Sequence, residues 1–146
     1  MSKWQGIQVA VTVAGGIIGY LVGGIDELLY ALLTFVIIDY VTGVMCAIVE
    51  KSLSSEVGAR GIFKKIMIFL MVIIANTVDT TVVGATEIGT HAIFRTATIC
   101  FYMANEGLSI FENAGRLGLP VPDWLREYVV KLKEKKIGGG EDGDGE

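Results

Sequence analysis

Four apolar runs, separated by short polar segments, dominate the pattern of hydrophobic and polar positions along the chain. They cover residues 7–24, 28–49, 62–83 and 92–110. A bilayer core about 30 Å thick needs roughly 20 residues of helix to cross it, so each run has a suitable length. The second and third runs are the strongest, whereas the first is rich in glycine and the fourth contains Arg95, Asn105 and Glu106. The pattern predicts an all-α membrane protein with four transmembrane helices, three spans being the alternative.

The distribution of Lys and Arg favours four spans. Lys3 precedes the first run. A second basic group lies between the second run and the first turn of the third, and a last group follows the fourth: Lys51, Arg60, Lys64 and Lys65, then Arg116, Arg126, Lys131, Lys133, Lys135 and Lys136. The two remaining loops contain no Lys or Arg. Basic residues stay on the cytoplasmic side of membrane proteins, so four spans with both termini in the cytoplasm satisfy the pattern. Three spans would separate the two basic groups.

The segment after the fourth run predicts a short amphipathic helix at the cytoplasmic membrane surface. Pro120 and Pro122 end the preceding helix, and Asp123 can cap a new one. Aromatic and basic residues suited to anchor it at anionic lipid are Trp124, Tyr128, Lys131 and Lys135. A solvated charged tail is the alternative. We therefore divide the chain into a transmembrane region (1–112), an interfacial helix (113–137) and a disordered acidic tail (138–146).

Composition excludes several classes of function. Of the 146 residues 52% are hydrophobic, and the mean hydropathy is +0.58, which leaves no room for a catalytic domain beside the spans. The net charge of −4 is supplied by the acidic segment 141–146, so nucleic acid is not an expected partner. No nucleophile–base pair, metal-ligand spacing or phosphate-binding loop is visible. We expect no enzyme activity and no cofactor.

Asp39 is the most informative residue, because it lies near the middle of the second run. A carboxylate there costs roughly 2.5–3.5 kcal/mol on insertion scales, so it should face a partner, a polar interior or water. Thr42 and Gly43 share its helix face. We find no basic residue at its depth, so we expect Asp39 to be protonated or to face water in an assembly. Further candidates for a lumen or an oligomer interface are Asn76, Thr98, Tyr102, Asn105 and Glu106.

Two other patterns concern packing. Asp79 and Arg95 fall at similar depth near the outer ends of the third and fourth runs, so we expect a buried ion pair between them. Gly15, Gly19 and Gly23 recur every four residues in the first run, a spacing that lets helix backbones approach closely. They could pack against another subunit or against the chain's own helices.

Five short motifs are spread over residues 39–125. They are Asp39-Tyr40-Val41-Thr42-Gly43, Lys51-Ser52-Leu53-Ser54-Ser55, Gly58-Ala59-Arg60-Gly61-Ile62-Phe63-Lys64-Lys65, Asn105-Glu106-Gly107-Leu108-Ser109-Ile110 with Asn113, and Gly118-Leu119-Pro120-Val121-Pro122-Asp123-Trp124-Leu125. These motifs resemble those of the toxin-secretion and phage-lysis holin family of Gram-positive phages and clostridia. The resemblance covers residues 28–136, in the same order and spacing. The first run and the acidic tail lie outside it.

The resemblance implies a protein of the bacterial cytoplasmic membrane that accumulates and then forms homo-oligomers. The resulting nonselective lesion would collapse the membrane potential and let a cell-wall hydrolase (endolysin) or a large toxin cross, with no direct binding of that cargo implied. The resemblance supplies no established pore-lining residue. The alternatives are a small multidrug-type or ion transporter, and a non-conducting membrane adaptor. The lesion size, the cargo, the timing and the host stay open.

Overall fold

The computed structural model describes residues 2–83, 92–124 and 127. Its main elements are α1 (Lys3–Leu21), α2 (Glu27–Val49), α3 (Ser55–Val78) and α4 (Ile93–Arg116), with a π-helical turn η1 (Asp79–Val83) continuing α3. Regular structure in the described residues is helical throughout, which confirms the predicted all-α fold class. Three stretches, Lys3–Leu21, Glu27–Val49 and Gly58–Val82, are long and apolar enough to cross a membrane.

Side-chain caps explain where the first two helices begin. The hydroxyl of Ser2 accepts the backbone N–H of Gln5 at 3.3 Å, and the side-chain carbonyl of Gln5 accepts the N–H of Ser2 at 2.9 Å. This reciprocal pair satisfies N–H groups that have no partner inside the helix. Asp26 caps α2 in a similar way, accepting the N–H of Leu29 at 2.9 Å. Both helices therefore begin at polar residues beside their apolar runs.

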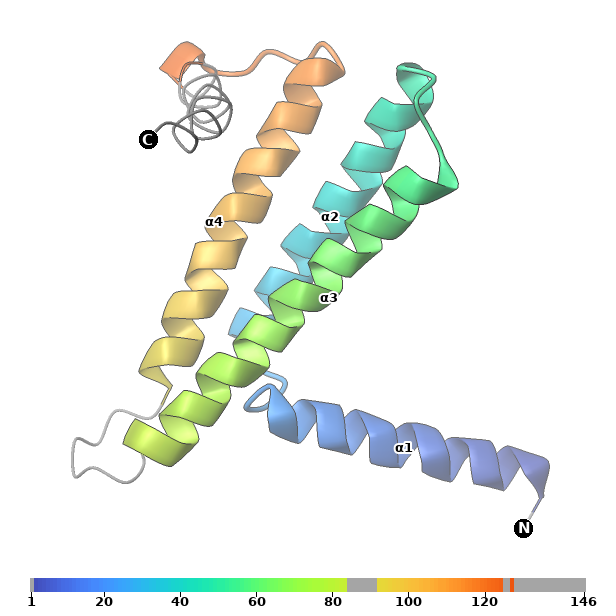
Figure 1. The fold of residues 1–146 in the computed structure, drawn as a ribbon, viewed down its shortest axis with the longest axis vertical. Helices are drawn as coiled ribbons and strands as arrows, with labels where there is room; N and C mark the ends of the chain where they lie inside the picture. The colour runs from blue at the N-terminus through green and yellow to red at the C-terminus, as the bar shows by residue number, and fades with distance from the viewer. Residues whose placement is uncertain (1, 84–91, 125–126, 128–146) are drawn as a thin grey trace, which may run out of the picture.

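Helices α2, α3 and α4 form a bundle, while α1 projects from one end of it (Figure 1). The α2–α3 connection and the C-terminal end of α4 lie at the opposite end of the bundle from α1. A small apolar core joins the three bundled helices, with Leu32 and Val36 from α2, Val72 from α3 and Ile99 from α4 at its centre. The bundle is thus a unit in itself, and α1 lies outside it.

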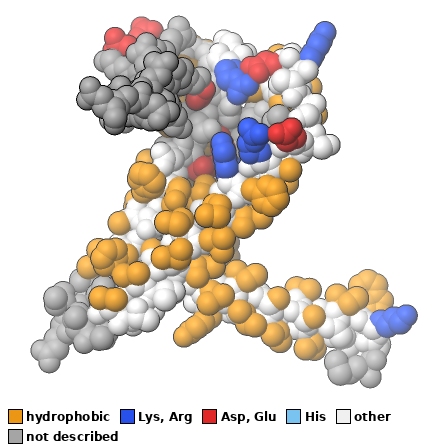
Figure 2. All heavy atoms as spheres, viewed as in Figure 1, with side chains coloured by type: hydrophobic (Ala, Val, Ile, Leu, Met, Phe, Trp, Pro, Cys, Tyr) orange, Lys and Arg blue, Asp and Glu red, His pale blue; other side chains and the backbone are white. Residues whose placement is uncertain are grey.

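Most large apolar side chains face outward. Figure 2 shows them over α1 and the adjoining part of the bundle, whereas charged side chains gather near the α2–α3 connection. Ile37, Phe63 and Phe101 are examples, with exposed fractions of 53%, 67% and 61%. Such a surface is unfavourable in water and suits a lipid environment. The apolar exterior of the bundle is therefore consistent with membrane insertion.

The fourth predicted span differs from the other three. Helix α4 runs from Ile93 to Arg116, six residues past the predicted end, and it is not among the three stretches that meet the length and hydropathy requirements for a span. Its buried residues are mostly polar: Arg95, Ile99, Glu106 and Asn113. The helix therefore depends on α2 and α3 to cover its polar face. The predicted interfacial helix lies largely outside the described residues.

Candidate functional site

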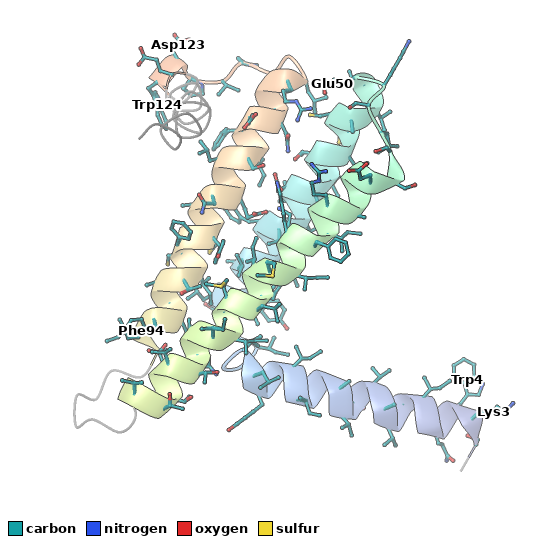
Figure 3. All side chains as sticks on the ribbon, viewed as in Figure 1. Lys3, Trp4, Glu50, Phe94, Asp123 and Trp124 are labelled. Atoms are coloured by element: carbon teal, nitrogen blue, oxygen red, sulfur yellow. The ribbon has the colours of Figure 1, made fainter. Side chains whose placement is uncertain are left out.

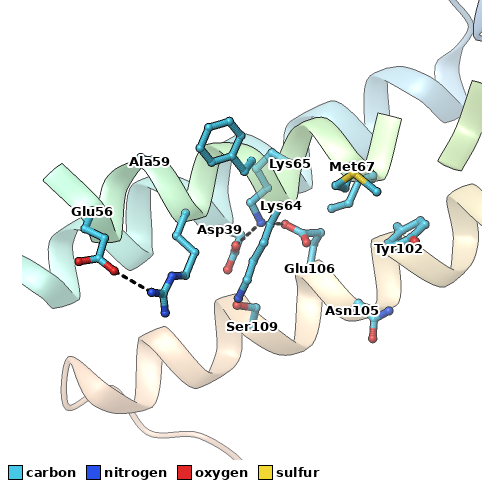
Figure 4. A pocket seen from close by; sticks show the side chains of 13 residues that line it. Asp39, Glu56, Ala59, Lys64, Lys65, Met67, Tyr102, Asn105, Glu106 and Ser109 are labelled. Atoms are coloured by element: carbon cyan, nitrogen blue, oxygen red, sulfur yellow. Dashed lines mark hydrogen bonds and ion pairs between the residues drawn. The ribbon is translucent and has the colours of Figure 1, made fainter. Parts of the chain in front are cut away.

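Three charged side chains meet inside the bundle, one from each helix. The ammonium of Lys65 on α3 donates hydrogen bonds to the carboxylates of Asp39 on α2 and Glu106 on α4 (Figure 4). Asp39 is 8% exposed and Glu106 is 7% exposed. We call Asp39, Lys65 and Glu106 the charge cluster. Because it links all three helices, it is a polar counterpart to the apolar core.

The expectation that Asp39 lacks a basic partner was wrong. Helix α3 begins at Ser55, seven residues before the apolar run that predicted it. Asp39 lies ten residues before the end of α2, and Lys65 lies ten residues after the start of α3, so the two reach the same depth. Glu106 lies ten residues before the end of α4. The hydropathy pattern placed Lys65 in the first turn of the third run, near the membrane surface, and so away from the depth of Asp39.

Asn113 extends the charge cluster and was missed as a site residue. Its side-chain amide donates to Thr42 Oγ1 at 3.0 Å and to Asp39 Oδ1 at 3.3 Å. Gly43 faces the same amide, since a Cβ on it would be in ordinary van der Waals contact with Asn113 Nδ2, at 3.7 Å. The predicted face of Asp39, Thr42 and Gly43 therefore exists, and it contacts α4 within the same chain. Glu106 was among the predicted lumen or interface candidates, whereas Asn113 lies beyond the predicted end of the fourth run at residue 110.

The charge cluster contains two carboxylates and one ammonium. Either carboxylate alone would balance Lys65, so the second adds an uncompensated negative charge unless it is protonated or hydrated. Burying an unpaired charge is costly, whereas a paired and hydrogen-bonded one costs much less. The group is thus sensitive to the loss of Lys65 and to any change that admits water.

A hollow of about 940 Å³ opens beside the charge cluster, between α3 and α4. Asp39, Lys65 and Glu106 line its floor, and Lys64 reaches across it toward Ser109 (Figure 4). Tyr102 and Asn105, both predicted as interface or lumen candidates, also line it. Tyr102 is half-buried and Asn105 is exposed. The hollow gives the charge cluster a polar route to the side of the bundle.

A second polar network lies at the other end of the bundle, around Arg95. Its guanidinium binds Asp26 in bidentate fashion, with N–O distances of 2.7 and 3.1 Å. It also donates to the carbonyls of Val22 at 2.6 Å and Gly24 at 3.1 Å. Arg95 is only 3% exposed, and these charge-assisted hydrogen bonds attach it to the turn between α1 and α2. The hydrogen bond from Arg95 is also the main cause of a lowered pKa for the Asp26 carboxyl.

The predicted ion pair between the side chains of Asp79 and Arg95 was wrong. The carboxylate of Asp79 accepts the backbone N–H groups of Phe94 at 3.0 Å and Arg95 at 2.7 Å, so it caps the start of α4. A carboxylate at a helix N-terminus is stabilised by these N–H groups and by the helix dipole. The two residues do lie at one depth, as expected, but the side chain of Arg95 points to Asp26.

The α1–α2 turn depends on Gly23 and Asn76. Gly23 has a φ of +83°, and a Cβ there would lie 2.3 Å from Asn76 Oδ1. The Asn76 amide donates to the carbonyl of Leu21 at 3.0 Å. Gly23 therefore serves the turn and is not part of α1, unlike the prediction of a glycine stripe through residue 23. A Cβ on Gly15 would meet no atom of another part of the chain within 4 Å, and one on Gly19 would meet only the side chain of Ile25.

The remaining predicted residues lie apart from these networks. Thr98 is half-buried on α4 and does not line the hollow. Trp124 is 70% exposed, while Tyr128, Lys131 and Lys135 fall outside the described residues. An exposed ion pair between Glu50 and Arg116 joins the ends of α2 and α4, at the end of the bundle that the sequence predicts to be cytoplasmic. The hydrogen bond from Arg116 lowers the pKa of Glu50. Among the described residues, no group of three potential ligands could hold a metal ion.

Comparison with known proteins assigns the chain to a family. The model of the bacteriophage holin family matches residues 16–134. An uncharacterized protein of Halalkalibacterium halodurans is 44% identical over 133 residues, covering 90% of this chain and 93% of that protein. A probable holin of Bacillus phage phi105 is 39% identical over 103 residues, covering 70% and 71%. No solved structure matches the chain. The chain therefore belongs to the bacteriophage holin family.

Proposed function

We propose that the chain is a holin that assembles in the bacterial cytoplasmic membrane into a nonselective lesion. The lesion collapses the membrane potential and releases a cell-wall hydrolase or a large toxin, which the chain itself does not need to bind. Membership of the holin family, which is not enzymatic, supports this reading. The charge cluster carries the proposal, because it puts two carboxylates and a lysine within otherwise apolar helices, beside an open polar hollow.

The charge cluster suggests how one sequence can be inert first and conducting later. In the described chain, Lys65, Asn113 and Thr42 satisfy the polar groups around Asp39. When subunits assemble, water in a lumen can replace these partners, and the excess carboxylate then ionises at no desolvation cost. Assembly would thus favour the hydrated arrangement. We place the lumen next to the hollow lined by Tyr102, Asn105 and Glu106.

The fold supports a multi-pass arrangement with the C-terminus in the cytoplasm. The α2–α3 connection and the end of α4 lie at the same end of the bundle (Figure 1), and the charged side chains gather there (Figure 2). Basic residues favour the cytoplasmic side. We propose that this end faces the cytoplasm, and that the N-terminus, before α1, is cytoplasmic as well.

The test is controlled expression in bacteria, with and without a cytoplasmic endolysin that lacks a signal peptide. A holin gives abrupt depolarisation at a set time after induction, and lysis only when the endolysin is present. The variant Asp39→Leu should accumulate and fail to open, whereas Asp39→Asn should accumulate and change the time of lysis. Gradual growth slowing without depolarisation would contradict the proposal, and saturable, selective transport would favour a transporter.

A further inference from the structure

The charge cluster holds two acids and one cation in a place that water reaches little. Lys65 donates a hydrogen bond to both Asp39 and Glu106. The side chains of the two acids are 12% and 9% exposed, and that of Lys65 is 16% exposed. If both acids were ionised, one negative charge would stay uncompensated among buried groups, which is costly. A proton on one of the acids removes this cost.

The other titratable groups around the cluster do not supply the missing positive charge. Those that line the hollows beside it are Tyr40 from α2, Glu56, Arg60 and Lys64 from α3, and Tyr102 and Arg116 from α4. Tyrosine hydroxyls are neutral near pH 7. Arg60 is paired with Glu56, and Arg116 with Glu50. Lys64 is exposed and crosses the hollow (Figure 4), and it forms no ion pair within the described part of the chain.

The hydrogen bonds favour Glu106 as the acid that carries the proton. Asp39 accepts through both oxygens, from Lys65 at Oδ2 and from the side-chain amide of Asn113 at Oδ1. Glu106 binds Lys65 through Oε2, so its Oε1 is available to carry a proton. Hydrogen bonds donated to a carboxylate favour its ionised form. Asp39 therefore keeps the negative charge, and the cluster with one protonated acid is neutral.

Water and protons reach the cluster from one end of the bundle. A second hollow of about 250 Å³ shares Asp39 with the larger one and extends to Ser52 and Leu53, in the α2–α3 connection. Glu50 lies at this end of the bundle and Phe94 at the opposite end (Figure 3). The polar path from the cluster therefore leads to the end that carries the α2–α3 connection.

The apolar core closes the path in the other direction. Leu32, Val72 and Ile99 come from the three bundled helices, and each is 0% exposed. On α4, Ile99 lies between Arg95 of the second polar network and Glu106 of the charge cluster. A dry apolar layer thus separates the two polar groups. The cluster exchanges protons with one side of the membrane.

We propose that the charge cluster of the closed chain holds one proton, exchanges it with the cytoplasm alone and releases it when the assembly opens. The proton passes from Glu106 to water, and both acids are then ionised and hydrated. This inference rests on the proposed function for the orientation and the opening, and it adds cytoplasmic pH as a regulator. Because the closed chain binds one proton more than the open one, a higher cytoplasmic pH favours opening. One proton changes the ratio of open to closed chains at most about tenfold per pH unit.

Infrared spectroscopy of the purified protein in detergent tests the bound proton directly. A protonated carboxyl group has a carbonyl stretching band separate from the bands of carboxylates. We expect this band in the wild type near pH 7, where exposed acids are ionised. Glu106→Gln and Asp39→Asn should each abolish it, because the remaining acid then pairs with Lys65 as a carboxylate. Glu56→Gln is the matched control, since Glu56 lines the same hollow with its side chain 80% exposed, and it should keep the band.

Absence of the band from the wild type, or its survival in Glu106→Gln and Asp39→Asn, would overturn the proposal. The second measurement is the delay between induction and depolarisation in cells. A permeant weak base or weak acid shifts the cytoplasmic pH at constant external pH. Raising the cytoplasmic pH should shorten the delay, and lowering it should lengthen the delay. Glu106→Gln should remove this dependence, whatever its own delay.

A delay that follows the external pH at constant cytoplasmic pH, or an equal response in Glu106→Gln, would also overturn the proposal. The two measurements separate this inference from the proposed function. The band without depolarisation at any pH would uphold the bound proton and contradict holin activity. Depolarisation in a protein that lacks the band would do the reverse.

Discussion

Lys65 on α3 donates a hydrogen bond to the carboxylate of Asp39 on α2, so the acid in the middle of the second apolar helix is paired within its own chain. The same ammonium also binds Glu106 on α4. The polar interior of the bundle thus depends on one cation that serves two acids.

Replacing Lys65 should destabilise the bundle much more than replacing either acid. Lys65→Met leaves two buried carboxylates unpaired, and removing one partner of a buried pair typically costs roughly 3–5 kcal/mol. Asp39→Asn and Glu106→Gln each leave Lys65 with one acid and should accumulate nearly as the wild type does. Membrane accumulation and thermal aggregation of the purified variants measure this. Adding Asp39→Asn and Glu106→Gln to Lys65→Met should restore accumulation, and equal losses from all three single variants would contradict the account.

Gly23 and Gly15 provide a matched pair of alanine substitutions. Gly23→Ala places a Cβ 2.3 Å from Asn76 Oδ1 at a φ of +83°, whereas a Cβ at Gly15 meets no atom within 4 Å. We expect Gly23→Ala to destabilise the protein by roughly 1 kcal/mol or more. Gly15→Ala should leave the stability of a single copy unchanged. Thermal unfolding in detergent compares the two, and similar midpoints would show that the turn is not fixed as described.

The pairing of Asp26 with Arg95 predicts a pH dependence. Arg95 lowers the pKa of Asp26 below its ordinary value of 3.8. A lowered acid pKa stabilises the folded state above pH 3.8, and this contribution is lost as the pH falls through the lowered pKa. Because the Asp26 side chain is 48% exposed, we expect a modest effect.

The variant Asp26→Asn should therefore unfold at a lower temperature than the wild type at pH 5–7, and the difference should shrink below about pH 4. Glu27→Gln is the control, because it removes the same charge one residue further along. That control should show a much smaller change in unfolding temperature. A difference between Asp26→Asn and wild type that stays constant down to pH 2 would disprove the linkage.

Topology can be mapped with single cysteines in the background lacking Cys46 and Cys100. Cysteines at Ser2, Ser54 and Gly139 should resist an impermeant thiol reagent in intact cells, because we place all three in the cytoplasm. A cysteine at Thr90 should react. Lysed cells, in which every cysteine becomes accessible, provide the control. Labelling of Gly139 without Ser54 would indicate three spans.

The apolar pattern alone located α2 well, since the predicted 28–49 compares with Glu27–Val49. It was less accurate for α3, which begins at Ser55 with two polar turns. These turns contain an ion pair between Glu56 and Arg60, and Gly58 and Gly61 lie against Tyr40 of α2. The earlier start moved Lys65 from the edge of the predicted span to the depth of Asp39, and so changed the reading of the site. Hydropathy measures transfer to lipid, so it does not detect polar helical turns at the end of a span.

Pairing within the site was harder to predict than depth. The apolar runs placed Asp79 and Arg95 at the same depth, and the structure has them there. Partners for the two charges were sought only among residues inside the apolar runs. Asp26 lies just outside the second run and reaches Arg95 because the α1–α2 turn lies beside the first turn of α4. The backbone N–H groups at the start of α4 then take the carboxylate of Asp79. A pattern of residue types does not show that backbone N–H groups can bind a carboxylate in place of a basic side chain.

Release of solutes of graded size from liposomes is the most direct test of the central claim that the chain forms a nonselective lesion. The purified protein is reconstituted at increasing density, and a small dye and dextrans up to the size of an endolysin are enclosed together. The account predicts that dye and large dextrans escape together above a threshold density, and that Asp39→Leu at the same density releases neither. Escape of the dye alone, rising in proportion to density without a threshold, would contradict it.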